Sequence, residues 1–516
     1  MRLGIDFGTT RTVAAAAENG NYPICTFSWK GEQKEYIPSL VAAKGDSIFF
    51  GWEAAEMLND PGVHVLRSVK RLAQQLNPEA IVEISPDFHI PLLDLLSLFL
   101  RHVMQMLKRN GNLLFRKGAR VEAMVATPAN AGSNQRFLTL EAFRRAGFAV
   151  IGAMNEPSAA AVEFAHRYLS NLGPKSPKKY MVVYDLGGGT FDTSAVALAG
   201  RNFEVIGHEG IGRLGGDDFD EVILDMALEA LGRSRDGLTP SDEARLLEEC
   251  RERKEGLKAN TRKMVVDPGP GAWEGNPVVI ETRELYARCD GLVRQSIEKL
   301  EEVLSTLRTL SVDMDDPRSL AAIYLVGGSV SFPPVARKIR EAYGSKVKVS
   351  PFPHAATAIG LAIAADPEAR ISMRESISRH FGVWREQEQG KDKVFDSIFI
   401  KDRQLDSDTG TMEATRTYRP AHNIGHFRYM ECSSVGSLGE PVGDIAFRKE
   451  TFFPYDPFLS DRKDLSRIPV ESRPDLLSQE VTETYSYEPD GRIRVAIENR
   501  TAGYRKVFDL GLGTRN

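Results

Sequence analysis

The chain has 516 residues, a net charge of −5, and ordinary proportions of hydrophobic (42%) and charged (27%) residues. This length predicts about two to four domains, and the slightly acidic balance gives no sign of a nucleic-acid-binding surface. No signal peptide precedes the first expected strand, and the most apolar stretch, Leu92 to Leu100, is too short to span a bilayer. The four scattered cysteines predict no disulfide framework. We therefore expect a cytoplasmic protein that binds neither nucleic acid nor a membrane.

The chain begins with a pattern typical of a phosphate-binding β-hairpin. A first apolar run ends at Asp6, a turn of Gly8, Thr9 and Thr10 follows, and a second apolar run comes next. Glycine lets the backbone approach a ligand closely, and threonine hydroxyls with successive N–H groups can bind phosphate oxygens. An aspartate at the end of such a strand is placed to hold Mg²⁺ through water molecules.

Two charged residues further along stand close to expected helix starts. Lys70 lies within Ser-Val-Lys-Arg-Leu, and Glu156 directly precedes Pro157 at the first turn of an expected helix. Taken alone, the first could be a surface lysine and the second a carboxylate favoured by the helix dipole. Their functional interpretation depends on the motifs around them.

The hairpin pattern then occurs a second time. A strand-like apolar run ends at Asp185, the turn contains Gly187, Gly188, Gly189 and Thr190, and another apolar run follows. Glycine-rich turns are common, but two copies, each with aspartate before the glycines and threonine after them, are a much stronger signal. The repetition predicts two similar lobes that hold one nucleotide phosphate chain between them.

Two more glycine pairs come later. Gly215 and Gly216 lie in Leu-Gly-Gly-Asp-Asp-Phe-Asp, and a buried strand is expected to run into Gly327, Gly328 and Ser329. The second turn could pass under an adenine and an α-phosphate. Up to about residue 366, strand-like and helical runs alternate, which is typical of an α/β protein.

The character of the chain changes beyond Ser376. β-Branched and aromatic residues dominate, with Gly, Pro and Asp turns between them. Near the end, Ile493, Val495 and Ile497 alternate with polar or small residues after an Asp490-Gly491 turn. This pattern predicts a hairpin with one buried face.

Taken in order, these motifs resemble those of the Hsp70 chaperone family, within the actin-like ATPase superfamily. The strings are Asp-Phe-Gly-Thr-Thr, Lys-Arg-Leu, Asn-Glu-Pro-Ser-Ala-Ala-Ala, Asp-Leu-Gly-Gly-Gly-Thr-Phe-Asp, Leu-Gly-Gly-Asp-Asp-Phe-Asp and Val-Gly-Gly-Ser. The resemblance implies an α/β, two-lobed actin-like ATPase (ribonuclease H-like) fold in residues 1–370. A β-rich, β-sandwich-like domain in residues 371–516 would follow it.

The resemblance also implies roles for individual residues. ATP or ADP with Mg²⁺ would lie between the lobes, and ATP would be hydrolysed slowly to ADP and phosphate. Lys70, Glu156, Asp185 and Thr190 would be catalytic, and Asp6 with Asp185 would hold Mg²⁺ through water. The other nucleotide-binding residues would be Gly8, Thr9, Thr10, Gly187, Gly188, Gly189, Gly215, Gly216, Lys254, Gly327, Gly328 and Ser329.

Several positions depart from the family pattern. The helix that grips adenosine usually reads Glu-x-x-Lys-Arg-x-x-Ser, and in Arg251–Lys258 only Lys254 matches it. The arginine that stacks on adenine is missing from Val330–Pro333, and His354 replaces a usual acid. The stretch 366–376 is polar and basic where an acidic, leucine-rich linker is usual.

For the β-rich end, the resemblance implies unfolded polypeptide as a ligand and co-chaperones as partners. No helical lid is expected, since the chain ends at Asn516, and ligand exchange would then be fast. An unrelated β-domain is the alternative. For the whole chain, two other functions stay open: a small-molecule kinase of the same superfamily, and a non-hydrolysing ATP-binding regulatory or scaffold protein. The departures from the family pattern favour the second modestly.

Overall fold

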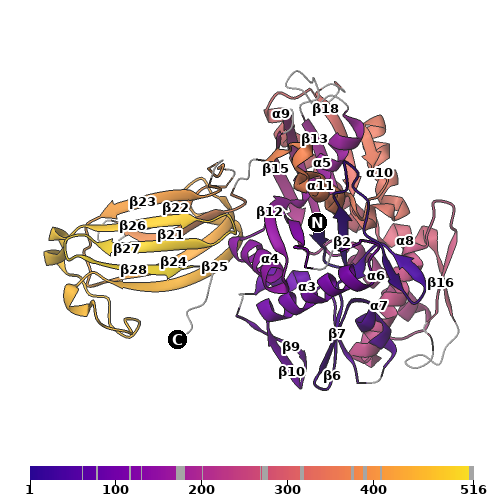
Figure 1. Ribbon diagram of the computed structural model, residues 1–516, viewed down its shortest axis with the longest axis horizontal. Coiled ribbons are helices and arrows are strands. Elements are labelled where there is room, and N and C mark those ends of the chain that lie inside the picture. The colour runs from indigo at the N-terminus through magenta and orange to yellow at the C-terminus, as the bar shows by residue number, and fades with distance from the viewer. Residues whose placement is uncertain are drawn as a thin grey trace. The chain divides into compact units, whose positions relative to one another are not determined.

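The computed structural model describes the chain apart from residues 61, 77–78, 116–117, 130, 170–179, 200–201, 268, 270–276, 314–315, 317–318, 374–376, 388–391, 402, 407–408 and 511–516. Part of the expected linker, residues 374–376, therefore lies outside the described residues. The chain forms two compact units, coloured along the sequence in Figure 1. The first contains Met1–Gln75, Ala80–Ala129 and Leu140–Met373; the second contains Leu76–Glu79, Asn130–Thr139 and Arg374–Asn516.

The first unit contains two large mixed sheets. One has the order β12-β11-β1-β2-β5 and the other β19-β18-β13-β14-β15-β20. The strands of the first are β1 (Arg2–Phe7), β2 (Arg11–Ala16), β5 (Ile37–Pro38), β11 (Glu122–Thr127) and β12 (Ala149–Asn155). Those of the second are β13 (Tyr180–Leu186), β14 (Phe191–Ala199), β15 (Asn202–Ile211), β18 (Leu320–Val326), β19 (Val347–Val349) and β20 (Ser372–Met373).

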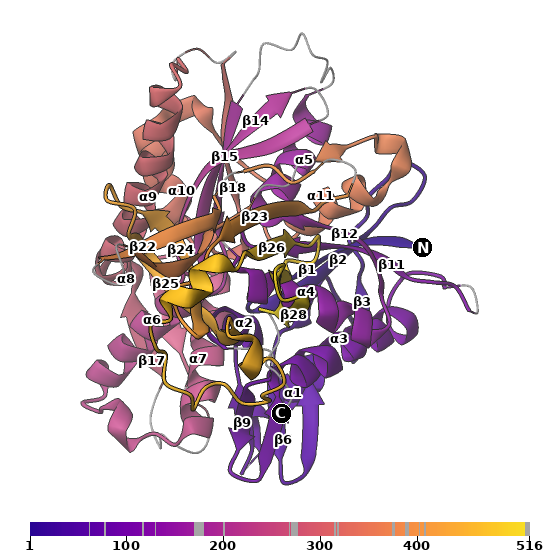
Figure 2. The same ribbon diagram turned by 90° about the vertical axis from the view of Figure 1, so that its left-hand side faces the viewer.

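Small sheets and helices complete this unit. The small sheets pair β3 (Phe27–Trp29) with β4 (Glu32–Lys34), β9 (Ile81–Ser85) with β10 (Phe88–Pro91), β16 (Lys263–Val266) with β17 (Val278–Glu281), and β6 (Val41–Lys44) with β7 (Ser47–Phe50) and β8 (His64–Leu66). The α-helices of the described residues are α1 (Gly51–Glu56), α2 (Val69–Gln75), α3 (Leu92–Arg109), α4 (Ser133–Ala146, which begins in residues of the second unit), α5 (Glu156–Tyr168), α6 (Gly216–Ala230), α7 (Pro240–Glu255), α8 (Thr282–Arg288), α9 (Asp290–Thr309), α10 (Pro333–Tyr343) and α11 (Ala356–Ala365). Of these, α9 packs on β14 and β15, as the turned view in Figure 2 shows.

The two large sheets repeat one arrangement, so the predicted duplication is confirmed. In the first, β1 pairs antiparallel with β2 and parallel with β11; in the second, β13 pairs antiparallel with β14 and parallel with β18. Helices α5 and α11 pack against each other. Their backbones approach so closely that a Cβ on Gly360 would lie 1.8 Å from the carbonyl oxygen of Ala159. Both lobes thus meet along one pair of small-residue helices.

Helix α3 buries an apolar face, and beside that face it half-buries an imidazole. The ring of His102 lies 5.9 Å from that of Phe50, measured between centroids. Its Nε2 atom is buried and has no hydrogen-bond partner. Burial lowers the pKa of His102 to about 4, since the charged form would lose its hydration.

This half-buried imidazole predicts a specific loss of stability in acid. The folded pKa of His102 lies below its unfolded value, so the unfolded chain binds more protons between about pH 4 and 6.5. Stability from this residue is therefore lost as the pH falls through that window. We expect His102→Leu to remove about 2 kcal/mol of the acid destabilisation between pH 7 and 4.5, measured from urea midpoints at both pH values. The exposed His89→Leu serves as the control, and an equal acid loss in wild type and His102→Leu would contradict the argument.

The second unit is built from two antiparallel four-stranded sheets, β22-β21-β24-β25 and β23-β26-β27-β28. Residues of both sheets, including Val383, Tyr429 and Tyr485, share one hydrophobic core, so the sheets form a sandwich. The strands are β21 (His380–Gln387), β22 (Asp392–Phe399), β23 (Met412–Tyr418), β24 (Ile424–Val435), β25 (Pro441–Pro454), β26 (Val481–Tyr487), β27 (Ile493–Asn499) and β28 (Tyr504–Asp509).

The final predicted hairpin is confirmed. β26 and β27 pair antiparallel, and Ile493, Val495 and Ile497 are buried at no more than 2% exposure. Gly491 has a φ of +83°, a conformation that favours glycine. Period-two alternation with an Asp-Gly turn therefore specified both the strand and its buried face.

Among the described residues, no helix is both long and apolar enough to cross a bilayer. All four cysteines are buried free thiols.

Candidate functional site

The two predicted turns are closed by the same hydrogen bond. The Gly8 N–H donates to the Arg11 carbonyl and the Gly187 N–H donates to the Thr190 carbonyl, each at 3.0 Å. Each turn follows an aspartate at the second-last position of its strand, Asp6 in β1 and Asp185 in β13. The duplication seen in the sheets therefore extends to the atoms of the loops.

The two turns also lie against each other. A Cβ placed on Gly188 would lie 2.2 Å from Oγ1 of Thr10, and one on Gly189 would lie 2.6 Å from Cγ2 of Thr9. Contacts this short exclude any side chain at either glycine without a shift of the opposing threonine. The glycines thus allow the two lobes to bring their turns together.

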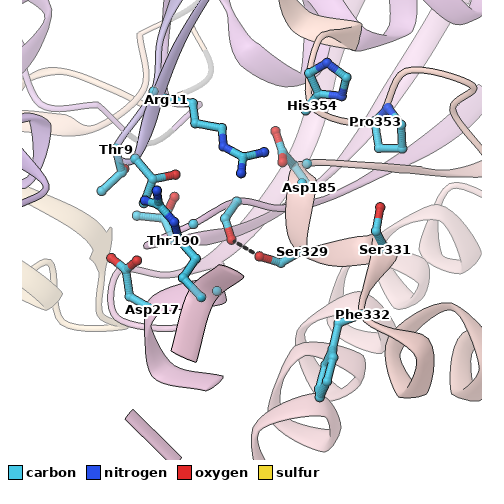
Figure 3. A pocket seen from close by; sticks show the side chains of 18 of the residues that line it. Thr9, Arg11, Asp185, Thr190, Asp217, Ser329, Ser331, Phe332, Pro353 and His354 are labelled. Carbon is cyan, nitrogen blue, oxygen red and sulfur yellow. Dashed lines mark hydrogen bonds between the residues drawn. The ribbon is translucent and has the colours of Figure 1, made fainter. Parts of the chain in front are cut away.

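Between the turns lies a cavity of about 300 Å³. Every predicted site residue lines it except Gly189 and Gly215. These two glycines do not line the cavity. A Cβ on Gly215 would lie 2.7 Å from the carbonyl of Gly188, so Gly215 permits close packing of the two backbones. Figure 3 shows side chains from both lobes around this space, among them Thr9, Asp185 and Thr190.

An ion pair connects two of the predicted catalytic residues. Nζ of Lys70, on α2, donates to Oε1 of Glu156, the first residue of α5, at 2.6 Å. Burial alone would lower the pKa of Lys70, but the nearby Glu156, Asp6 and Asp192 outweigh it, and the pKa is raised. Lys70 therefore remains an ammonium group within the buried wall of the cavity.

Carboxylates outnumber this ammonium. Burial raises the pKa of Asp6 to about 7, with Lys70 opposing and Glu156 adding to the shift. Burial likewise raises the pKa of Asp192 to about 7, and it raises the pKa of Asp185 well above its ordinary value. Acids crowded in this way have too little positive charge near them, which is the electrostatic situation that a bound cation relieves.

The glycine turn after β18 closes another side of the cavity. Gly327 has a φ of +86°, and a Cβ there would lie 2.3 Å from the carbonyl oxygen of Leu186, so only glycine fits. The Ser329 hydroxyl donates to the Gly187 carbonyl at 2.8 Å (Figure 3). The third predicted turn is thereby fixed to the second.

Lys254 lines the cavity but is held by protein groups. Its Nζ donates to the Gly216 carbonyl at 2.5 Å and pairs with Asp220 at 2.7 Å. Both side chains are at most 5% exposed. The one residue that matches the family's adenosine helix is therefore tied to α6.

The sequence prediction missed three charged residues that line the cavity near Lys254. Arg11 lies 4.1 Å from the ring centroid of Tyr36 and pairs with Glu255 at 2.5 Å, while Arg251 is buried with its Nε unpaired. Arg11 follows the first turn directly, and Arg251 and Glu255 flank Lys254 on α7. Their adjacency to predicted residues was the available signal. Asp192, at the end of the second motif, was also missed.

Comparison with known proteins identifies the family of the chain. The sequence profile of the Hsp70 protein family matches residues 101–369, slightly more than half of the chain. The chain belongs to the Hsp70 family. Its first unit is accordingly the two-lobed actin-like ATPase fold, and a β-rich unit follows. Because the match begins at residue 101, the placement of Asp6 and Lys70 depends on the geometry given above.

Two relatives show the level of sequence identity within the family. A chaperone protein HscA homolog of Pseudomonas fluorescens strain SBW25 is 29% identical over 383 residues, which cover 71% of this chain and 57% of that protein. A chaperone protein DnaK of Mycoplasmopsis pulmonis is 29% identical over 367 residues, covering 70% and 57%. The chain thus spans little more than half the length of the curated relatives it matches.

Proposed function

We propose that this protein is an Hsp70-like chaperone ATPase that binds ATP with Mg²⁺ between its lobes and hydrolyses it slowly to ADP and phosphate. The observation that carries the proposal is the pair of turns with one hydrogen-bond pattern, facing each other across a cavity with Lys70 and Glu156 in its wall. In this proposal, residues 1–370 form the nucleotide-binding domain and residues 371–516 form the β-rich domain.

In this proposal the turns hold the phosphates. Thr9, Thr10 and Thr190 line the cavity together with Gly8, Gly187 and Gly188, and Gly189 lies next to them in the second turn. Such N–H concavities favour anions. The nucleoside would extend toward Gly327, Gly328 and Ser329, beside Gly215, Gly216 and Lys254.

The donor set fits Mg²⁺ held through water. Asp6, Glu156, Asp185 and Asp192 bring four carboxylates around one lysine, and the pKa values of the three aspartates are raised. In the described part of the chain, no three acidic, histidine or cysteine side chains converge closely enough to ligate a metal directly. Asp6 and Asp185 would therefore orient coordinated water. When bound, Mg²⁺ would neutralise phosphate charge.

Hydrolysis in this proposal is mostly positioning and electrostatics. Lys70 supplies a buried positive charge for the oxygens that gain charge in the transition state. Glu156 holds that ammonium in place, and with Asp185 and Thr190 it orders the attacking water. The cavity end near Arg11 and Glu255 takes no part in the chemical step.

A second candidate is a non-hydrolysing regulatory or scaffold protein that uses ATP as a structural ligand. The observation that favours it is the nucleoside end of the cavity, where Lys254 is bound to Asp220 and Glu255 is bound to Arg11. With these groups occupied, the protein supplies fewer free contacts for a nucleoside.

Turnover separates the two candidates. We expect purified protein to release phosphate from ATP slowly, with no added acceptor, and to lose both binding and release when Mg²⁺ is chelated. Isothermal titration measures binding, and a coupled assay measures phosphate. Binding without phosphate release would favour the scaffold, release only with a small-molecule acceptor would favour a kinase, and no binding would overturn the nucleotide site.

For the second unit we propose binding of unfolded polypeptide, with co-chaperones as partners of the whole protein. The support is family membership together with the sandwich of two four-stranded sheets.

A further inference from the structure

A second cavity, of about 1010 Å³, lies within the β-rich unit. It opens at the end of the sandwich where β21 passes to β22 and β23 passes to β24. Its wall includes apolar surface from Trp384, Ile424, Phe427 and Val470. The volume suits side chains of an extended peptide segment.

The floor of this cavity is charged, which breaks the core pattern of the sandwich. On β21, the core residue Val383 is followed two positions later by Arg385; on β26, Glu483 stands between the core residues Val481 and Tyr485. Inward positions alternate along a strand, so these charged residues occupy core sites. An unpaired charge at such a site would be strongly destabilising.

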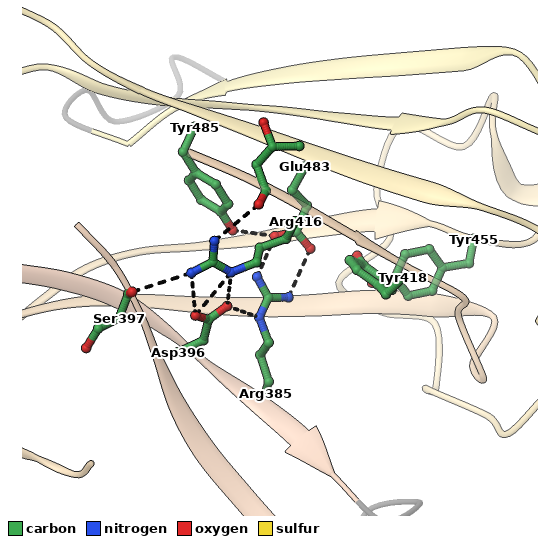
Figure 4. Close-up of polar contacts among 9 residues, drawn as sticks. Arg385, Asp396, Ser397, Arg416, Tyr418, Tyr455, Glu483 and Tyr485 are labelled. Atoms are coloured by element: carbon green, nitrogen blue, oxygen red, sulfur yellow. Dashed lines mark hydrogen bonds and ion pairs between the residues drawn. The ribbon is translucent and has the colours of Figure 1, made fainter. Parts of the chain in front are cut away.

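The floor charges neutralise one another (Figure 4). Arg385 donates to Asp396 at 2.7 Å and to both oxygens of Glu483 at 3.1 and 2.7 Å. Arg416 donates to Asp396 at 2.9 to 3.3 Å. The hydroxyl of Tyr485 donates to Glu483 at 2.5 Å. Each carboxylate of the floor is therefore already opposed by arginine.

The wall as a whole carries an excess of positive charge. Five arginine or lysine residues line the cavity against two carboxylates: Arg385, Lys393, Arg416, Arg419 and Arg428 against Glu386 and Asp396. Two carboxylates that pair with wall residues reduce this excess, because Glu483 pairs with Arg385 and Glu450 pairs with Arg428 and His426. Glu386 stands opposite Lys393 across the strands and lies 3.9 Å from His422.

Two cations of the wall, Arg419 and Lys393, are exposed and make no ion pair with the residues that the structure describes. Arg416, although paired, keeps 37% of its side chain exposed. Free donors thus exceed free acceptors around the apolar wall. A carboxylate ligand would find two unpaired cations there, whereas an ammonium ligand would find one carboxylate, Glu386, that no described lysine or arginine holds.

We propose that this cavity binds an extended peptide segment in which an acidic side chain stands beside apolar ones. The inference rests on the proposed polypeptide-binding function of the β-rich unit and adds the class of segment selected. Apolar side chains would lie against Val470 and Phe427, and the carboxylate would face Arg419.

The test uses the full chain and three fluorescein-labelled nonapeptides with the same Leu-Phe-Leu centre and glutamate, glutamine or lysine flanks. Fluorescence anisotropy gives each dissociation constant. We expect the glutamate peptide to bind about 3- to 10-fold more tightly than the lysine peptide, with the difference shrinking as salt is added. Arg419→Glu should reduce or reverse this preference and change binding of the glutamine peptide less than about twofold. Arg505→Glu, on β28 and outside the cavity wall, is the matched control and should leave the preference unchanged.

The outcomes separate the two levels of the proposal. Equal binding of the three peptides, tighter binding of the lysine peptide, or equal effects of Arg419→Glu and Arg505→Glu would overturn the acidic preference while leaving polypeptide binding in place. Failure of all three peptides to bind would overturn the polypeptide-binding function itself, and the preference with it.

Discussion

Gly188→Glu is expected to abolish ATP binding. The Cβ alone would lie 2.2 Å from Oγ1 of Thr10, so the substitution must push the two turns apart. The added carboxylate would then lie beside Asp6 and Asp185, in the space in which we place the phosphate oxygens. Its negative charge would repel the phosphate. Isothermal titration with ATP and Mg²⁺ should show a loss of affinity on the order of 100-fold or more, equivalent to about 3 kcal/mol.

Gly212→Glu is the matched control for this experiment. Gly212 follows β15, is exposed, and has no atom within 4 Å of the place a Cβ would take. The two variants carry the same change in charge and side chain, and only one of them alters the turns. Similar ATP affinities for the two variants would mean that the nucleotide does not bind in the cavity lined by the two turns.

The sequence was sufficient for the parts of the fold that follow from local pattern. The two hairpins, the duplicated lobes and the β26–β27 hairpin were predicted because glycine turns and strand periodicity are local signals. Gly360 shows the limit of that reasoning. It lies within an apolar helix, and its contact with the Ala159 carbonyl depends on which helix packs against α11. Nothing in the neighbouring sequence specifies that partner.

The candidate site was predicted unevenly for the same reason. Glycines and threonines of the turns act through their own backbone, so their spacing located them in the cavity wall. Lys254 was predicted by its position in a helix motif, but its hydrogen bond to Gly216 and its ion pair with Asp220 join residues 38 and 34 positions apart in the chain. Pairing of this kind cannot be read from spacing.

The charged floor of the second cavity was outside the reach of the sequence prediction. Arg385, Asp396, Arg416 and Glu483 lie on four different strands, and each alone is typical of a solvated strand face. Their burial follows from the closure of two sheets over them. The network replaces apolar core at that end of the sandwich.

Lys70→Ala is expected to lower the rate of ATP hydrolysis by on the order of 100-fold or more while ATP still binds. Lys70 is 6% exposed and its ammonium pairs with Glu156 at 2.6 Å, so its charge acts in a site with little water to screen it. Phosphate binding uses many N–H and hydroxyl groups of the turns, and it should survive the loss of one lysine. Single-turnover experiments with enzyme in excess separate the chemical step from binding and release.

Lys263→Ala provides the matched control, since this lysine also pairs with a glutamate, Glu281, at 3.1 Å but lies exposed on β16. Removing Lys70 leaves Glu156 as one more unopposed carboxylate beside Asp6, Asp185 and Asp192, so a second variant is needed to exclude simple misfolding. Lys70→Ala combined with Glu156→Gln removes both charges of the pair and should recover thermal stability without recovering the rate. A single-turnover rate that stays near the wild-type value in Lys70→Ala would assign the charge stabilisation to another group. A rate restored by the double variant would mean that Lys70 serves only to neutralise Glu156.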